Sequence, residues 1–285
     1  MSDAITLSSD EGNLVVQSKG AKTLIKAVPH DEFPQLSSNT KGKGMNVPRE
    51  ELLRGIESVV YAASPSMIRP ELGSISITFK QGSLICVATD SFRLAEKTVA
   101  ASSIKESDGM LIPLKHAGEL VFILERLKDE MVTINSEDAQ LTVEGGDVKY
   151  VSRVVDGNFP DYKVIIPKTP STEATLLKND FAEMLRKARV FSGDEQQVGL
   201  HVYPKKKIFT ATAQSASVGE MSDSMEGALS GDDIDINFHI GYLADCLSTI
   251  PADSITLSFS GVGRALVIRG VSDSSFMYLV MPLNR

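Results

Sequence analysis

The chain has 285 residues, of which 42% are hydrophobic and 23% are charged. This balance is typical of a folded globular protein of about two domains and excludes a disordered chain. The formal net charge of −8 argues against a protein that binds nucleic acid over its whole surface. It does not exclude a local basic face on an otherwise acidic protein.

Cys86 and Cys246 lie within apolar runs, which predicts buried thiols in a reducing compartment and no disulfide framework. The N-terminus lacks the apolar core of a signal peptide, and no apolar run approaches the roughly 18 residues of a membrane span. We therefore expect a cytoplasmic protein with no membrane partner.

In chain order, the first elements expected are three short strands without a helix. Turn residues separate them at 10–13 and 19–20, which indicates a meander of hairpins. The segment 37–44 is rich in Ser, Lys, Asn and Gly and is predicted to be a linker. The three strands are expected at 5–7, 14–16 and 23–25.

A longer series of elements follows the linker. Pro48 suits the first turn of a helix, and apolar residues at helical spacing continue this helix to Val59 and Val60. A second helix, with Leu120 and Leu127 on its apolar side, is expected after residue 114. The strands predicted around these helices are 75–79, 84–88, 93–99, 110–112, 132–135, 140–143 and 149–155.

The same order returns in the last part of the chain. Helices are expected at 179–190 and around 242–247, so helices start near residues 49, 115, 179 and 240. The strands predicted are 198–202, 208–213, 217–225, 234–238, 255–259, 265–268 and 276–281. This order indicates repeated half-units of one strand, one helix and three strands, an α+β class with helices on one face of antiparallel sheets.

A sequence repeat supports this organisation. Residues 32–36 (Glu-Phe-Pro-Gln-Leu) return as 158–162 (Asn-Phe-Pro-Asp-Tyr), and Phe33 and Phe159 are 126 residues apart. A further 126 residues separate Phe159 from Arg285. The period indicates duplicated modules, and the N-terminal three strands match only the end of a half-unit.

Catalytic motifs find little support. The four histidines are scattered without metal-ligand spacing, and no GxSxG or P-loop pattern occurs, so neither a metal nor a cofactor is expected. The run 261–263 (Gly-Val-Gly) links two expected strands and is interpreted as a hairpin turn. Asp90 and Arg93 could polarise a substrate, but a tight turn held by the Asp side chain is the favoured interpretation.

Basic residues do not by themselves indicate nucleic-acid binding. The run 205–207 (Lys-Lys-Lys) follows Pro204 between two strands and is interpreted as a solvated hairpin tip. The arginines and lysines on the expected helices are offset by neighbouring glutamates, as on ordinary solvent-facing surfaces.

Four segments carry a resemblance to a known family. They are 69–72 (Arg-Pro-Glu-Leu), 87–95 (Val-Ala-Thr-Asp-Ser-Phe-Arg-Leu-Ala), 156–162 (Asp-Gly-Asn-Phe-Pro-Asp-Tyr) and 278–285 (Tyr-Leu-Val-Met-Pro-Leu-Asn-Arg). Together they closely resemble the bacterial DNA sliding clamp, the beta subunit of DNA polymerase III, in order from about residue 4 to the C-terminus. The half-unit repetition is what the DNA-clamp fold of that family would require.

The resemblance implies a ring of six similar domains, three from each of two chains joined head to tail, with helices lining the hole and sheets outside. Such a processivity factor encircles duplex DNA through a weak, sequence-independent contact and tethers polymerases. It is not an enzyme. By position in the family pattern, Lys115 and Lys187 would face the DNA.

The resemblance also implies an apolar pocket between the second and third domains. It would receive short peptides from replicative and repair polymerases and from the clamp loader. The sequence departs from the usual Gly-His after Thr-Asp, which is Ser91-Phe92 here, and also around Gly263 and Ala265, so peptide preference is expected to shift. On the matching positions the wall would be Arg69, Leu72, Thr89, Ser91, Phe92, Arg93, Leu94, Pro160, Ile165, Tyr242, Leu279, Met281 and Leu283.

The resemblance divides the chain into 1–36, the C-terminal remnant of a first clamp domain, 45–162, the central domain, and 163–285, the C-terminal domain. Three full modules would need about 378 residues, about 90 more than the chain has. We therefore expect Met1 to be an internal methionine of a longer protein, or the chain to be a fragment. In the family the first domain meets the third domain of the partner chain, so its loss argues against a closed dimeric ring and leaves open the alternative of a peptide-binding module that closes no ring.

Overall fold

A computed structural model describes residues 4–28, 44–80, 82–101, 107–137 and 139–283 of the chain. The chain divides into two compact units, Met1–Lys41 and Gly42–Arg285. The expected linker up to residue 43, the 32–36 motif and the turn residue Asp138 lie outside the described residues.

The first unit is a three-stranded antiparallel meander. Strands β1 (Thr6–Asp10), β2 (Asn13–Ser18) and β3 (Ala21–Ile25) pair in the order β1-β2-β3. The three predicted strands are confirmed, although β1 begins at Thr6 and extends to Asp10. Gly12 and Gly20 adopt positive φ values of 83° and 89°, which explains why glycine stands at both turns.

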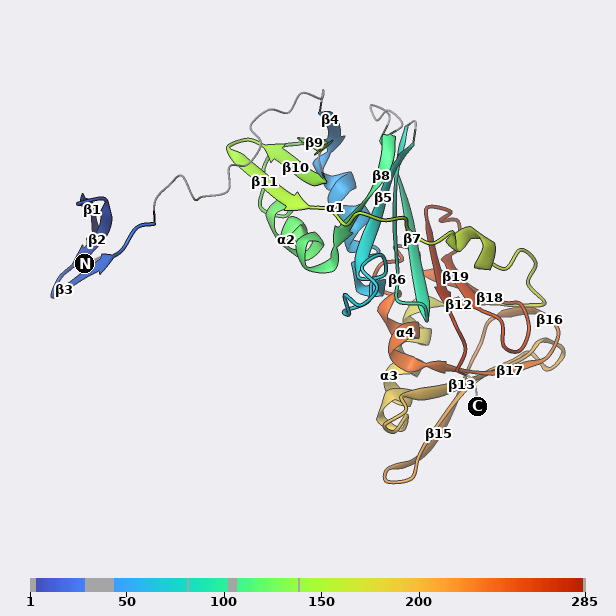
Figure 1. The fold of residues 1–285 in the computed structure, drawn as a ribbon. Helices are drawn as coiled ribbons and strands as arrows, with labels where there is room; N and C mark the ends of the chain where they lie inside the picture. Colours follow the sequence, from blue (N-terminus) through green and yellow to red (C-terminus); the bar gives the residue numbers. More distant parts are fainter. Residues whose placement is uncertain (1–3, 29–43, 81, 102–106, 138, 284–285) are drawn as a thin grey trace. The chain divides into compact units, whose positions relative to one another are not determined.

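The second unit begins with two half-units (Figure 1). The first consists of β4 (Met45–Pro48), α1 (Arg49–Glu57), β5 (Ser74–Lys80), β6 (Ser83–Thr89) and β7 (Arg93–Ala100), with a short 3-10 helix η2 (Val60–Ala62) after α1. The second consists of β8 (Ser107–Pro113), α2 (Leu114–Leu124), β9 (Met131–Glu137), β10 (Gln140–Gly145) and β11 (Val148–Arg153).

Two further half-units complete the chain. The third consists of β12 (Thr172–Leu177), α3 (Lys178–Val190), β13 (Gln197–Tyr203), β14 (Ile208–Ser215) and β15 (Gly219–Met225). The fourth consists of β17 (Ile234–His239), α4 (Ile240–Asp245), β18 (Ser254–Phe259), β19 (Leu266–Gly270) and β20 (Phe276–Val280). Two 3-10 turns, η3 (Tyr162–Ile165) and η4 (Pro204–Lys206), and an extra strand β16 (Ala228–Gly231) lie between these elements.

The predicted order of strand, helix and three strands is confirmed in all four half-units, but several boundaries were wrong. Pro48 does not open the first turn; it ends β4 and caps α1 with a φ of −58°. Val59 and Val60 lie beyond α1, Leu127 lies beyond α2, and α4 stops before Cys246 and Leu247. These residues still face the core, so apolar spacing alone did not reveal where each helix ends.

Three strands had no predicted range. β4 contains a proline, β12 buries Leu176 but otherwise only the small side chains of Thr172 and Ala174, and β16 has just four residues. Tertiary pairing decides these strands, because β4 is held by β9 and β12 lies between β16 and β18.

The strands form three sheets in the second unit. The orders are β11-β10-β9-β4, β15-β14-β13-β17, and a nine-stranded sheet β16-β12-β18-β19-β20-β7-β6-β5-β8. The first strand of each half-unit joins the sheet of the neighbouring half-unit, as β4 does with β9 and β17 with β13. The nine-stranded sheet is continuous across the junction of the two halves because β7 and β20 pair antiparallel from Arg93↔Val280 to Lys97↔Phe276.

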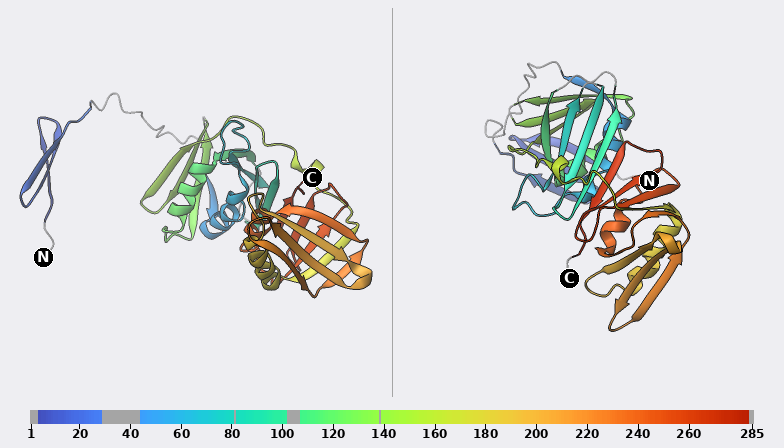
Figure 2. Two further views of the ribbon diagram at one scale, coloured as in Figure 1. Left: turned by 90° about the horizontal axis from the view of Figure 1, so that it is seen from below. Right: turned by 90° about the vertical axis from the view of Figure 1, so that its right-hand side faces the viewer.

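The main core lies between the helices and one face of the sheets. Helix α1 packs on α2 and α3 packs on α4 (Figure 2). Helix α3 buries Phe181, Met184 and Leu185, and the Phe181 ring meets Phe209 of β14 edge-on at 6.1 Å. Full burial of such side chains contributes about 1.5–3 kcal/mol each, so the helices are fixed by this apolar stripe. Among the described residues, no helix has the length and apolar character needed to span a membrane.

A second, smaller apolar cluster lies where the two halves of the nine-stranded sheet join. Its buried members are Val87, Leu94, Ala265, Val267, Met277 and Leu279. Phe159, Tyr162 and Ile166, from the segment that connects β11 to β12, pack against this cluster. The connecting segment therefore covers the face of the sheet at the junction, close to several of the residues expected to line a pocket.

Candidate functional site

The junction between β7 and β20 brings several of the expected wall residues together. Leu94 stands directly opposite Leu279 in the ladder, and both side chains are buried in the junction cluster. Successive residues of a strand point to opposite faces, so Arg93 lies on the other face, with Ala95, Tyr278 and Val280 of the main core. The expected wall is thus divided between the two faces of the sheet end.

The turn Asp90–Arg93 closes the sheet end between β6 and β7. One oxygen of Asp90, Oδ1, accepts the backbone N–H groups of Phe92 and Arg93, both at 2.9 Å. Thr89 Oγ1 donates to the Arg93 carbonyl at 2.6 Å and accepts the N–H of Ser91 at 3.2 Å. The interpretation of Asp90 as the residue that holds a tight turn is therefore confirmed. Ser91 sits at a φ of +80°, a region that favours glycine.

The Arg93 side chain is the electrostatic centre of the junction. Its Nε donates to Asp90 Oδ2 at 2.9 Å, and its Nη1 forms an ion pair with Asp245 Oδ2 at the end of α4. The guanidinium lies 4.5 Å from the ring centroid of Tyr242 and 5.9 Å from that of Tyr61. Burial alone would lower the pKa of Arg93, but Tyr278 and the Asp245 and Asp90 carboxylates outweigh it and raise that pKa above its usual value. Arg93 therefore stays charged at any pH at which the protein folds.

Three apolar side chains at the junction are open to solvent. Phe92 is 61% exposed, Ile165 is 52% exposed and Met281 is 37% exposed. The backbone ties two of them together, because the N–H of Met281 donates to the Phe92 carbonyl at 2.8 Å. The N–H of Leu283 donates to the Asn237 carbonyl at 2.9 Å, which fixes the C-terminal segment beside β17. Pro160, like Leu283, is partly buried.

The remaining expected wall residues lie in the segment before β5. Arg69 is exposed and forms an ion pair with Glu71 at 3.0 Å, whereas Leu72 is buried. The N–H of Leu72 donates to the Arg69 carbonyl at 3.0 Å, so the two residues share one tight turn.

The two lysines expected to face DNA differ in their surroundings. Lys115 is exposed in the first turn of α2. Lys187, on α3, lies 3.1 Å from Asp223 Oδ2 and 3.8 Å from Glu183 Oε1. Two carboxylates therefore offset the Lys187 charge, and the sequence spacing revealed only the Glu183 partner.

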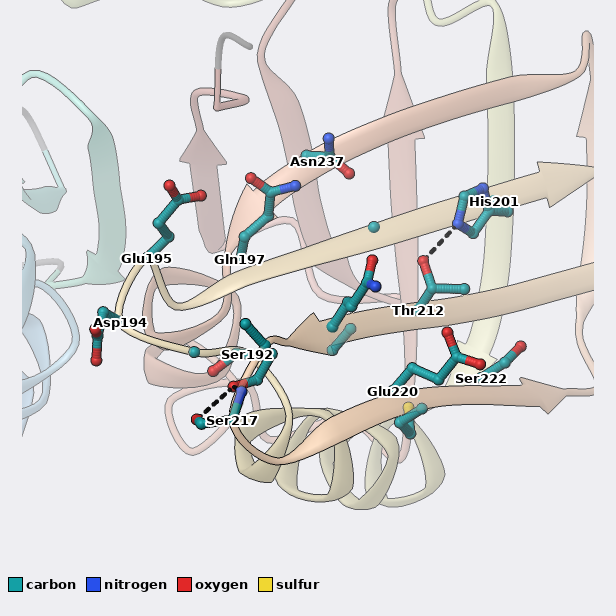
Figure 3. A pocket seen from close by; sticks show the side chains of 17 residues that line it. Ser192, Asp194, Glu195, Gln197, His201, Thr212, Ser217, Glu220, Ser222 and Asn237 are labelled. Atoms are coloured by element: carbon teal, nitrogen blue, oxygen red, sulfur yellow. Dashed lines mark hydrogen bonds between the residues drawn. The ribbon is translucent and has the colours of Figure 1, made fainter.

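A cavity of about 1180 Å³ lies elsewhere, on the solvent face of β13, β14 and β15 (Figure 3), and contains none of the thirteen expected wall residues. Polar side chains line it, among them Glu195, Glu220, Asn237, His201 and Thr212. Sequence analysis did not identify it, although the polar alternation of β13 and β14 was a usable signal.

His201 is held across three strands at one side of this cavity. Its Nε2 lies 2.8 Å from Thr212 Oγ1, and its Nδ1 lies 2.6 Å from Asp235 Oδ1. Tyr203 donates to the same Asp235 oxygen at 2.6 Å, and this bond, with His201, lowers the pKa of Asp235. Within the described parts of the chain, no group of three His, Cys, Asp or Glu side chains could hold a metal ion.

The buried cysteines carry no chemistry of their own. Cys86 and Cys246 are free thiols in the core, and burial raises the pKa of Cys86 to about 12. A thiol with so high a pKa is not a nucleophile at neutral pH.

The family model of the DNA polymerase III beta subunit central domain matches residues 46–161, and that of its C-terminal domain matches residues 163–284. The beta sliding clamp of Bacillus subtilis is 28% identical over 274 residues, covering 95% of this chain and 72% of the relative. That of Proteus mirabilis is 23% identical, covering 98% of this chain and 76% of the relative.

Solved structures show the same likeness. The DNA polymerase sliding clamp of Bacillus subtilis matches with a TM-score of 0.90 at 26% identity, over 99% of this chain and 75% of that chain. The DNA polymerase III beta subunit of Thermotoga maritima matches with a TM-score of 0.88, also at 26% identity, over 99% of this chain and 76% of that chain. The α+β clamp fold expected from the resemblance is confirmed. The two family models cover most of the chain, and the chain therefore belongs to the DNA polymerase III beta subunit family, the sliding clamps, which are non-catalytic processivity factors of DNA replication.

Proposed function

We propose that this protein acts in a ring around duplex DNA and tethers polymerases and repair proteins through a peptide pocket at the β7–β20 junction. One observation carries the proposal: the nine-stranded sheet is continuous from one domain into the next, while α1, α2 and α3 pack against it on the face of the main core. Such a joint, repeated head to tail, builds a curved wall with sheets outside and helices inside. The domains proposed for this arrangement are 45–162 and 163–285, with 1–36 as the end of a first domain.

The β7–β20 joint suggests how one chain would meet another. β7 is the last strand of the first half-unit of its domain, and β15 holds the same place in the C-terminal domain. Among the described strands β15 pairs only with β14, so its outer edge can accept a strand. Glu220 is exposed on this edge strand, whereas Asp223 is already paired with Lys187. We therefore propose that the contact with the first domain of a second copy lies at β15.

The DNA contact is proposed to be weak and independent of sequence. A closed ring is retained topologically, so an acidic protein needs only a few lysines near the phosphates. Lys115 is free to make such a contact from α2 because its side chain is exposed. Lys187 would first have to leave Asp223 and Glu183, so its contribution should be smaller.

The pocket is proposed to take an extended peptide by its apolar side chains. Phe92, Ile165 and Met281 offer the accessible apolar surface, and Leu94 and Leu279 form the floor beneath it. On the other face of the sheet end, Tyr242 and the stem of Arg93 add a second contact area. The polymerases, repair factors and clamp loader are proposed to share this pocket.

Fluorescence anisotropy with a labelled polymerase-tail peptide tests the pocket. Wild-type protein should bind saturably, and Met281→Asp and Leu94→Asp should each weaken binding by at least about tenfold, since a carboxylate in an apolar contact is strongly unfavourable. Met131→Asp is the matched control, because Met131 is 42% exposed at the start of β9, away from the junction. Equal affinities for all four proteins would exclude this pocket.

Retention on DNA tests the ring. The protein, loaded by a clamp loader on nicked circular DNA, should stay bound through gel filtration and be released when the circle is cut. Sedimentation velocity of the same preparation should show a dimer. Saturable peptide binding by a monomer that is never retained on circular DNA would instead support the alternative, a peptide-binding module that closes no ring.

A further inference from the structure

We propose that Asp245 is a positioning residue for the peptide pocket: it pairs with Arg93, and through the Arg93 guanidinium it holds the two sides of the pocket in register. This inference rests on the proposed function, because it concerns the same pocket. It assigns a role to a residue that the sequence did not single out.

The contact crosses from one domain to the other. Arg93 belongs to β7 of the central domain, whereas Asp245 ends α4 of the C-terminal domain. The Arg93 side chain is only 13% exposed and the Asp245 side chain is 45% exposed, so the pair seals the junction at the surface. Asp90 holds the inner Nε of the same guanidinium at 2.9 Å. The planar guanidinium therefore bridges two carboxylates, one from each domain, in a fixed orientation.

Asp245 occupies a place where a carboxylate does not stabilise its own helix. It is the last residue of α4, and the carbonyl end of a helix repels negative charge. The favourable partner is instead Arg93, 152 residues away in the chain. A lysine or an asparagine would suit α4 better, so the carboxylate is best explained by the bridge.

The bridge joins the two contact areas of the pocket. On the central-domain side, Arg93 belongs to the turn that presents Phe92, and the Phe92 carbonyl accepts the N–H of Met281 at 2.8 Å. On the other side, α4 carries Tyr242, whose ring lies 4.5 Å below the guanidinium. When Asp245 loses its charge, the ion pair no longer holds α4 against this turn. A binding peptide must then order the two contact areas, and the entropy cost of that ordering lowers its affinity.

The test compares wild-type protein with Asp245→Asn, Asp245→Glu and the control Asp253→Asn, which alters an exposed carboxylate of the same domain. Two fluorescein-labelled peptides with the same apolar residues are used, one flanked by lysines and one by serines. We expect Asp245→Asn to weaken both peptides by the same ~3- to 10-fold, as loss of a charged link at an interface does. Asp245→Glu should recover at least half of the loss, and Asp253→Asn should bind like wild type.

Thermal unfolding and amide hydrogen exchange separate positioning from a merely structural role. Asp245→Asn should leave the unfolding midpoint within about 2 °C of wild type. A half-exposed ion pair adds little to stability, and removal of a negative charge from the carbonyl end of α4 stabilises the helix. The amides of Met281 and Tyr242 should nevertheless exchange faster in the variant, without any peptide present.

The outcomes are distinct. A loss confined to the lysine-flanked peptide would overturn the inference, because Asp245 would then contact the peptide directly. A large drop in the unfolding midpoint together with a failed rescue by Asp245→Glu would also overturn it. If wild-type protein binds the peptides and Asp245→Asn binds them with the same affinity, only this inference is refuted. If wild-type protein does not bind them, the proposed function is refuted and this inference with it.

Discussion

The replacement Ser91→Gly tests how much strain the Asp90–Arg93 turn contains. Ser91 has a φ of +80°, and its neighbours are fixed by the two 2.9 Å bonds to Asp90 Oδ1 and by the Thr89 side chain, so it cannot relax to negative φ. A side chain in this region costs about 1–2 kcal/mol relative to ordinary backbone. Glycine removes that cost but loses roughly 0.5–1 kcal/mol through the greater freedom of the unfolded chain. The net expectation is a gain of about 0.5–1 kcal/mol.

Urea and thermal unfolding measure the effect. A gain of this size should raise the midpoint by about 1–4 °C in a domain of 150–250 residues. Ser91→Ala is the matched control, since it keeps Cβ and should not increase stability. Ser272, at a φ of 65°, offers a second site at which glycine should stabilise by a similar amount.

A loss of stability in Ser91→Gly, with Ser272→Gly stabilised, would refute the reasoning for the turn. It would mean that the side chain of Ser91 contributes more than its backbone conformation costs. Equal stability of Ser91→Gly and Ser91→Ala would show that the Cβ atom carries no strain there.

Two further predictions concern titratable groups. Burial would raise the pKa of Asp273, but the two hydrogen bonds from Ser275 and the Lys97 charge lower that pKa. The ionised Asp273 carboxylate therefore stabilises the fold fully above its unfolded pKa near 3.8, and this contribution is lost as the pH falls through the folded pKa. The unfolding midpoint of Asp273→Asn should fall less steeply than that of wild type between pH 6 and 2.5, and parallel curves would contradict this. Because both cysteines are buried and the pKa of Cys86 is raised to about 12, a disulfide reagent at pH 8 should label no thiol in the native protein and two after unfolding, whereas fast labelling of the native protein would show that the core opens.

Periodicity predicted most elements because each half-unit repeats the same alternation between a helix stripe and strand faces. Leu52, Phe181 and Leu243 recur at the corresponding buried helix positions, and a short-range pattern of this kind is visible in one chain. Helix ends were less accurate. Val60, Leu127 and Cys246 are apolar and face the core, so they fit the helical spacing although the backbone has already left the helix.

The pocket residues show a similar division. The turn around Asp90 could be interpreted from its residues, because an Asp side chain binds N–H groups only two and three residues away. That Arg93 and Leu94 lie on opposite faces follows from strand alternation once β7 is assigned. That the thirteen expected residues form one pocket stays a prediction, which peptide binding by the Met281→Asp and Leu94→Asp variants tests.

The sequence by itself determined the half-unit order, the repeat and the family, because these depend on local spacing and on motifs that survive in the linear chain. Only the tertiary structure decided the pairing of β7 with β20, the ion pair of Lys187 with Asp223, and the bridge from Arg93 to Asp245. Each of these joins residues from 36 to more than 150 positions apart, and nothing in the local pattern distinguishes Asp245 from any other helix-end carboxylate. The folded backbone brings each charge near its partner, and no local pattern along the sequence shows which residue that partner will be.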